Sequence, residues 1–269
     1  QVKDLIGVNV PVYTFYNPKG SFNNTTTKYY REILQNFQTT LETVYEPLNP
    51  EKLLSACVLG HKIDSRLMAI QQARMTNHLS LDNSAYFELM RAQEYLLPLD
   101  YLNLLGKIDI LEQAIEPARA RLMVSGILPP SPEVLKFLDE LGVSVVADDL
   151  LAVSRRIPKF PMDAPLLPLD YLTDRFFILP PCSTRAGDLE ERLHHIDKLM
   201  QASQAQGILF DIVKFCEPEL FDHRLLVKTL RERNIPVLTL ETELQAYLSG
   251  QDKTRIEAFT ELLFDMVSA

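Results

Sequence analysis

The pattern of apolar and polar positions changes near residue 120. Residues 27–117 carry apolar side chains at helical spacing, as at Ile33 and Phe37, among many Leu, Gln, Glu and Arg residues. Pro50 stands near the first turn of a second helix, which we expect to reach about Thr76. This part of the chain is therefore predicted to be largely helical.

From residue 120 onward, short apolar runs alternate with amphipathic stretches. The runs are residues 121–126, 143–147, 207–213 and 236–240. The helical stretches between and after them are residues 131–142, 187–205, 218–233 and 253–266. Continuous apolar strands separated by amphipathic helices are typical of a parallel sheet with helices on both faces. We therefore predict an α/β, Rossmann-like fold for residues 120–269.

Residues 8–16 form a further run of β-branched and aromatic residues, which ends at a turn signal, Asn-Pro-Lys-Gly, at residues 17–20. This predicts a strand, and a strand without neighbours is not stable. The sequence also begins at Gln1, without an initiator methionine. We therefore expect this chain to be an excised piece of a longer protein.

Composition narrows the class of protein. The chain has 27 basic and 36 acidic residues, a net charge of −9, which argues against a nucleic-acid-binding surface. No apolar run approaches the roughly 20 residues of a membrane span. Three cysteines, an odd number, do not make a disulfide framework. With no signal peptide visible, we expect a cytoplasmic protein that binds neither nucleic acid nor membrane.

Common catalytic signatures are absent from the sequence. There is no G-x-G-x-x-G, no G-x-x-x-x-G-K-[ST], no G-x-S-x-G and no H-E-x-x-H. With only nine glycines in the chain, a loop that cradles phosphate groups is not expected. The fold would permit nucleotide binding, but the motifs that would indicate it are missing.

Two of the three cysteines fall in predicted loops. Cys182 precedes a helix and Cys216 follows the third strand, 34 residues later. A parallel sheet can bring both to its carboxyl edge, where helix N-termini and basic side chains favour thiolates. Such a pair is compatible with an iron–sulfur cluster, with zinc, or with two unrelated buried thiols. Cys57 lies within a helical stretch and is predicted to be part of the core.

A carboxylate pair follows the second predicted strand. Asp148 and Asp149 could bind a metal or act as an acid/base pair, and Arg155 and Arg156 come shortly after them. The alternative is a turn-forming Asp that caps the next segment and pairs with a solvated Arg. Both interpretations place the pair at the edge where open parallel sheets hold their ligands.

Three other features are polar or irregular. The loop at residues 157–168 contains four prolines and sits on the ligand edge of the sheet. His194 and His195 lie in mid-helix, where their side chains diverge by about 100° and cannot chelate one ion together, so we interpret them as surface residues. Arg255 suits an anionic substrate group or a helix-face ion pair.

Three C-terminal motifs carry a family resemblance. They are Lys214-Phe215-Cys216, the run at residues 235–241 and the Thr-Arg-Ile-Glu-Ala-Phe stretch at residues 254–259. Residues 145–149 and Cys182 match in the same order. Residues 120–265 thus resemble the C-terminal region of the 2-hydroxyacyl-CoA dehydratase and benzoyl-CoA reductase family.

The resemblance implies a heterodimer of related subunits, each with two α/β domains and a 4Fe-4S cluster held by three cysteines. It also implies that residues 1–119 are the remainder of the first α/β domain, one strand plus helices, ahead of the C-terminal α/β domain at residues 120–269. Cys182 and Cys216 would be the second and third ligands of the cluster iron. The position of the first ligand lies upstream of residue 8 in the family, so we expect this chain to be the C-terminal part of a longer subunit, inactive alone and a poor holder of the cluster.

The implied activity is the radical, ketyl-type elimination of water from a CoA thioester. The electron would come from a separate ATP-dependent activator. Gly126, which closes the first predicted strand, and Arg255 are the candidate substrate-binding residues. Two alternatives stay open: a benzoyl-CoA reductase-like subunit, and a non-catalytic paralogue whose fold serves assembly with a partner.

Overall fold

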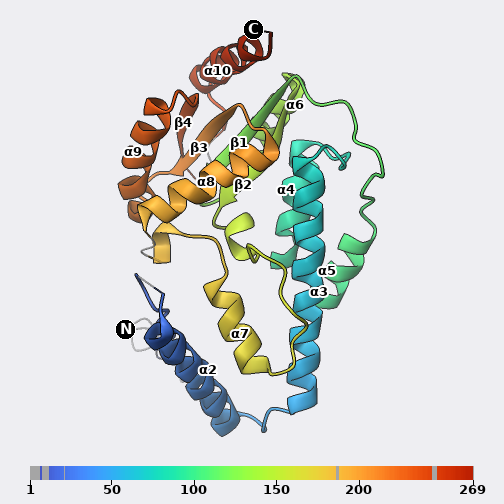
Figure 1. Cartoon of the computed structure of the whole chain (residues 1–269), viewed down its shortest axis with the longest axis vertical. Helices are drawn as coiled ribbons and strands as arrows, with labels where there is room; N and C mark the ends of the chain where they lie inside the picture. The colour runs from blue at the N-terminus through green and yellow to red at the C-terminus, as the bar shows by residue number, and fades with distance from the viewer. Residues whose placement is uncertain (1–6, 8–11, 21, 186–187, 244–246, 269) are drawn as a thin grey trace.

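A four-stranded parallel sheet forms the centre of the C-terminal half of the molecule (Figure 1). We describe a computed structural model, which covers residues 7, 12–20, 22–185, 188–243 and 247–268. The strands are β1 (Ala120–Gly126), β2 (Val143–Leu150), β3 (Gly207–Val213) and β4 (Val237–Thr242). Their order is β2-β1-β3-β4, and every neighbouring pair is parallel. The predicted α/β fold is confirmed.

Helices cover both faces of this sheet. They are α6 (Pro132–Glu140), α8 (Leu189–Ser203), α9 (Glu217–Glu232) and α10 (Gly250–Ser268). On one face, Met123 and Phe210 of the sheet share a buried cluster with Ile196 of α8 and Leu230 of α9. A second cluster, on the other face, contains Val124 and Leu209 together with residues of α6 and α10, among them Leu138 and Leu263. Alternate residues of each strand thus face opposite helical layers.

The start and end of α6 show how local sequence sets these elements. Ser131 is the N-cap, and its side chain accepts a hydrogen bond from the backbone N–H of Val134, while Pro132 occupies the first turn. Gly142 is the last residue before β2. Its φ of +76° lies in the left-handed region that favours glycine.

The segment before the sheet is helical, as predicted. It contains α2 (Asn24–Val44), α3 (Pro50–Met75), α4 (Asn83–Arg91) and α5 (Pro98–Gly106). Leu67, Tyr86 and Leu105 of the last three helices belong to the same buried cluster as Leu122 of β1. These three helices therefore share a core with the sheet, whereas α2 lies at the far end of the molecule from α10 (Figure 1).

The strand predicted at residues 8–16 is not found where it can be checked. Residues 8–11 lie outside the described residues, and residues 12–16 are irregular. The rings of Tyr13 and Phe15 pack on Phe37 of α2, with centroids 4.9 and 6.1 Å away, so the aromatic residues that suggested a strand bury themselves against a helix instead.

One helix, α7 (Pro168–Phe177), was not predicted. Pro168 is the last residue of the predicted proline-rich loop, but in the structure it occupies the first turn of α7, where its missing N–H leaves no helical hydrogen bond unmade. Arg175 of α7 pairs with Asp64 of α3 at 2.6 Å, and Phe176 stacks on Tyr30 of α2 at 4.1 Å. Helix α7 therefore links α2 to α3.

The outer edge of β2 is occupied by an asparagine side chain. The Asn83 amide donates to the backbone oxygen of Val143 at 2.9 Å, and its Oδ1 accepts from the N–H of Val145 at 2.7 Å. Arg74 of α3 donates to the oxygen of Val145 at 2.8 Å. Side chains from α3 and α4 thus satisfy edge groups that another strand would otherwise pair. No helix in the described part of the chain has the length and apolarity needed to cross a membrane.

Candidate functional site

Four charged side chains are buried together near the carboxyl ends of the strands. They are Asp149 of β2, Arg155 of the 3-10 turn at Ser154–Arg156, Arg192 of α8 and Glu219 of α9. We call them the buried charge cluster. Each of these side chains is at most 2% exposed. Charges removed from water in this way must be paired to persist.

The arginines bridge the two acids. Arg155 binds Asp149 with both branches, Nε to Oδ1 at 2.7 Å and Nη2 to Oδ2 at 2.9 Å, and its Nη1 reaches Oε1 of Glu219 at 2.5 Å. Arg192 donates from Nη2 to Oδ2 of Asp149 at 3.2 Å and to Oε2 of Glu219 at 2.8 Å. The Ser125 hydroxyl of β1 donates to the same Asp149 oxygen at 2.9 Å. The four buried groups thus carry two positive and two negative charges, and the partly exposed Asp222 also accepts from Nη1 of Arg192 at 3.1 Å.

The pKa shifts follow from this pairing. Burial alone would raise the pKa of Asp149, but the Arg155 and Arg192 guanidiniums hold that pKa well below its usual range. The pKa of Glu219 is lowered by the same two arginines against the same burial. Both carboxylates are therefore ionised at neutral pH, and the cluster joins the sheet, α8, α9 and the turn after β2.

Cys182 lies against this cluster. Its Sγ is 3.7 Å from Nη1 of Arg155 and 3.1 Å from the Thr184 hydroxyl, and the residue is 3% exposed. The next residue, Ser183, donates to Oε1 of Glu219 at 2.6 Å. The cluster thus fixes the segment that carries Cys182.

Cys216 is the residue before α9, so it lies three positions before Glu219. It is partly exposed and follows Phe215, which has φ +66° and is 92% exposed. The hydrogen bond between Ser183 and Glu219 brings the two cysteine-bearing segments side by side. Cys57 is apart from them, buried in α3, where burial raises the pKa of its thiol. That agrees with the core position predicted for it.

A cavity of about 400 Å³ opens beside Cys182. Four arginines contribute to its lining: Arg155, Arg156, Arg175 and Arg185. Three of them pair with carboxylates, whereas Arg185 donates to the backbone oxygens of Phe176 and Pro180 and has no carboxylate partner among the described residues. The cavity is therefore a positively charged space with one thiol in its wall.

The predicted carboxylate pair does not act as a pair. Asp148 and Asp149 lie within β2, not after it, so their side chains leave on opposite faces of the sheet. Asp149 joins the buried charge cluster, while Oδ1 of Asp148 accepts from the N–H groups of Leu150 and Ser154 at 3.2 and 3.1 Å. The solvated arginine of the turn interpretation is wrong as well, because Arg155 is fully buried.

The position of Asp148 predicts a pH-dependent substitution effect. Burial raises its pKa from 3.8 to about 6, although hydrogen bonds from Ser154 and Leu150 act against this. Between those two pH values the folded protein keeps a proton that the unfolded chain has lost, so this group's contribution to stability falls as pH rises. Asp148→Asn keeps an Oδ1 acceptor and removes the titration.

We expect Asp148→Asn to raise the free energy of unfolding, relative to wild type, by about 2–3 kcal/mol more at pH 7.5 than at pH 4. Urea denaturation at both pH values measures the difference. A substitution effect that is the same at both pH values would contradict the assignment.

The two histidines of α8 and the two candidate substrate-binding residues lie in different surroundings. His194 is exposed, as expected, but His195 was wrongly interpreted as a surface residue: its Nε2 is buried, and burial lowers its pKa to about 4. Arg255 donates from Nη2 to the backbone oxygen of Thr239 at 2.5 Å and contacts Asp252 at 3.3 Å. Gly126 ends β1 with φ +156°, tightly against the backbone of Asp211. The substrate-binding roles of Gly126 and Arg255 stay a prediction.

Sequence reasoning missed Arg192, Glu219 and Ser125. A signal was present, because Arg192 lies four residues before the buried Ile196 and so shares the inner face of α8. Glu219 similarly lies seven residues before the buried Leu226 of α9. A charge on the apolar face of a helix indicates a buried partner, here supplied by residues far apart in the sequence.

The ligands for a metal are incomplete within this chain. In the part of the chain that the structure describes, no three His, Cys, Asp or Glu side chains are grouped so that they could hold a metal ion. The described residues offer two thiols at neighbouring segments and no third ligand with them, so they do not fit a complete cluster site.

Comparison with known proteins places this arrangement in a family. The sequence profile of the 2-hydroxyglutaryl-CoA dehydratase, D-component, matches residues 2–263, nearly the whole chain. The chain belongs to this family. The resemblance seen in the three C-terminal motifs is thereby confirmed.

Individual members of the family show the same relationship. The chain is 33% identical to the (R)-phenyllactyl-CoA dehydratase beta subunit of Clostridium sporogenes over 154 residues, 56% of this chain and 41% of that protein. It is 28% identical to the (R)-2-hydroxyglutaryl-CoA dehydratase subunit beta of Acidaminococcus fermentans over 187 residues, 65% of this chain and 48% of that one. It is 25% identical to the lactoyl-CoA dehydratase subunit beta of Anaerotignum propionicum, again over 187 residues, 68% and 50% of the two chains. The chain spans about half the length of the curated relatives it matches.

Proposed function

We propose that this chain is part of the iron–sulfur subunit of a 2-hydroxyacyl-CoA dehydratase, which eliminates water from a CoA thioester by a radical route. The family supports the reaction class, and the three relatives named above are dehydratase beta subunits acting, by their names, on different 2-hydroxyacyl-CoA thioesters. The observation that carries the proposal is the thiol of Cys182 in the wall of an arginine-lined cavity, beside the segment of Cys216.

In this proposal Cys182 and Cys216 provide two thiolate ligands of a 4Fe-4S cluster, and further ligands come from outside the residues described. A cluster of this kind supplies one-electron chemistry and an iron that can accept a carbonyl oxygen. Because the chain's own thiols do not complete the site, we derive no reaction step through it.

The chain's own residues have defined tasks. Arg155 directs Nη1 toward the sulfur of Cys182 at 3.7 Å, an arrangement in which an N–H donor shares the negative charge of a thiolate ligand. Glu219 holds Ser183 at 2.6 Å and so fixes the Cys182 segment relative to α9. Arg185, without a carboxylate partner among the described residues, gives the cavity a positive charge that would attract the anionic thioester.

The proposed function also includes partner proteins. Because the relatives are named beta subunits, we propose that this protein works with a paralogous subunit, as a heterodimer. An ATP-dependent activator would supply the electron.

Iron content tests the proposal directly. After anaerobic reconstitution with iron and sulfide, the protein isolated from its native source should hold about four irons per subunit. We expect Cys182→Ser and Cys216→Ser each to lower this content by half or more. Cys57→Ser is the matched control, because it removes a thiol from the core of α3, and it should leave the iron content unchanged.

Unchanged iron in both the Cys182 and the Cys216 variants would overturn the proposal. That outcome would favour the alternative of a non-catalytic subunit that serves assembly. Reduction of an aromatic thioester without release of water from a 2-hydroxyacyl-CoA would indicate the reductase branch instead.

A further inference from the structure

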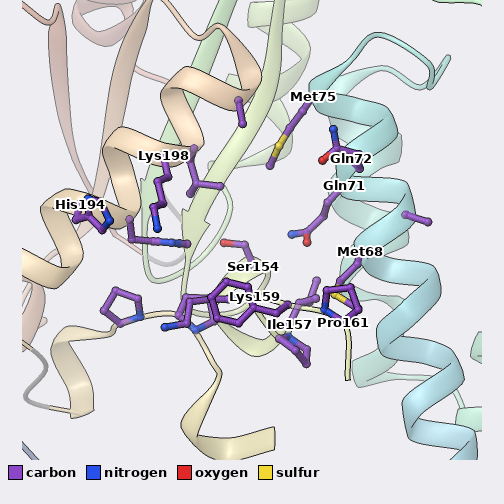
Figure 2. Close-up of a pocket in the computed structure, with 18 of the residues that line it drawn as sticks. Met68, Gln71, Gln72, Met75, Ser154, Ile157, Lys159, Pro161, His194 and Lys198 are labelled. Carbon is purple, nitrogen blue, oxygen red and sulfur yellow. The ribbon is translucent and has the colours of Figure 1, made fainter. Parts of the chain in front are cut away.

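A second, larger cavity of about 790 Å³ lies between α3, α8 and the proline-rich segment that follows β2 (Figure 2). Pro180 and Pro181 belong to its wall, whereas Leu179 and Cys182 belong to the wall of the arginine-lined cavity. One short segment thus separates the two spaces. The volume is typical of sites that bind small molecules.

Much of the wall of this cavity is apolar. Met68 and Met75 of α3, Ile157 and Phe160 of the proline-rich segment and Leu199 of α8 contribute to it. In Figure 2, Met75 and Gln71 reach from α3 toward the space that Lys198 enters from α8. Flexible Met side chains adapt to apolar ligands of varied shape. The cavity therefore suits a ligand with an apolar body.

Positive charge in this wall exceeds negative charge by one. Lys159 and Lys198 line the cavity, and Glu191 is the carboxylate among its described lining residues. Within the described residues, neither lysine forms an ion pair. Partial burial lowers the pKa of Lys159, Glu191 acts in the opposite direction, and the positive charges of Arg185 and Lys198 lower it further. Two ammonium groups that repel each other are stabilised when an anion binds between them.

A buried imidazole nitrogen in the same wall lacks a partner. Nε2 of His195 is buried and has no hydrogen-bond partner among the described residues. Lys159 and Lys198 line the same cavity. Buried polar atoms are normally satisfied, which indicates that a bound molecule completes the contact of His195 Nε2.

We propose that this cavity binds a small monocarboxylate with an apolar tail, with the carboxylate on Lys159, Lys198 and His195 and the tail against the methionines of α3. One excess positive charge suits a single negative charge and is too little to balance a polyphosphate. The site is separate from Cys182, and the inference does not depend on the proposed iron–sulfur function.

Isothermal titration calorimetry with two matched probes tests this. We expect 4-phenylbutyrate to bind the protein at least about tenfold more tightly than the uncharged 4-phenylbutanamide, because only the former has a negative charge that can pair with the lysine ammonium groups. Lys198→Met should weaken the binding of the carboxylate by about tenfold and leave the binding of the amide unchanged. Lys62→Met, on an exposed position of α3 outside the cavity, is the matched control and should change neither.

Lys198 is exposed, so its replacement is not expected to disturb the fold, and Lys198→Gln provides a second variant without the charge. Cys182→Ser should leave the binding of 4-phenylbutyrate unchanged, which separates this site from the iron site. Equal binding of the two probes, no saturable binding of the carboxylate, or an equal loss in Lys62→Met would each overturn the proposal.

Discussion

Arg155→Met is expected to lower the free energy of unfolding by about 3–5 kcal/mol, because it leaves buried carboxylates without one of their two cations. Asp149 and Glu219 are at most 1% exposed, and Arg155 makes three of the short contacts to them. Methionine fills much of the same volume without the charge. Arg192 stays in place, so the decrease in the free energy of unfolding measures the part of the cluster's stabilisation that Arg155 provides. Urea denaturation at pH 7 gives the value.

The neighbouring arginine offers a matched control. Arg156 is 49% exposed and pairs with Glu94 at 3.1 Å at the surface, where ion pairs contribute about 0–1 kcal/mol. Arg156→Met should therefore cost less than about 1 kcal/mol. If the two substitutions cost the same, burial of the charge cluster would not be the source of the effect.

Gly126→Ala is expected to destabilise the protein by a comparable amount, about 3–5 kcal/mol, from backbone strain and overpacking together. At φ +156° a residue with a side chain is strained, and the added Cβ would overlap the backbone oxygen of Asp211 on β3. The sheet would have to open between its two central strands, or the end of β1 would have to move. Thermal unfolding followed by circular dichroism measures the loss.

Gly60→Ala is the control for this substitution. Gly60 lies within α3, and a Cβ there would meet no atom within 4 Å. Alanine in a helix interior is favoured over glycine by about 0.5–1 kcal/mol, so this variant should be slightly more stable than the wild type. A loss of stability in Gly60→Ala similar to that in Gly126→Ala would show that any added methyl group is harmful, not the overlap with Asp211.

The sequence predicts those strands and helices in which the spacing of apolar residues matches a single type of secondary structure. The four strands are found because runs such as residues 207–213 are apolar on both faces, as a covered parallel sheet requires. The end of β2 is not found, because Asp148 and Asp149 look like residues of a turn while their partners come from distant elements. Helix α7 is not predicted, because Pro168 at its first turn follows three other prolines and resembles the end of a loop.

Part of the candidate site can likewise be predicted from the sequence, and part of it cannot. The two cysteine-bearing segments could be placed at one edge of the sheet because topology alone brings them there. The burial of Arg155 could not, because an arginine is ordinarily solvated and its burial here depends on acids 6 positions before it and 64 positions after it in the chain. The cavity beside His195 could not be predicted either, because its wall combines α3, α8 and the proline-rich segment, which are far apart in the sequence.

The asparagine at the edge of β2 has a consequence for assembly. By donating to Val143 and accepting from Val145, the Asn83 amide occupies the backbone groups through which a further strand would recognise β2. Strand addition from another molecule, the common first step toward fibrous aggregates, is thereby blocked on this side of the sheet. A complex that enlarges the sheet would therefore add its strand beside β4, because Asn83 and Arg74 together occupy the outward backbone groups of Val143 and Val145.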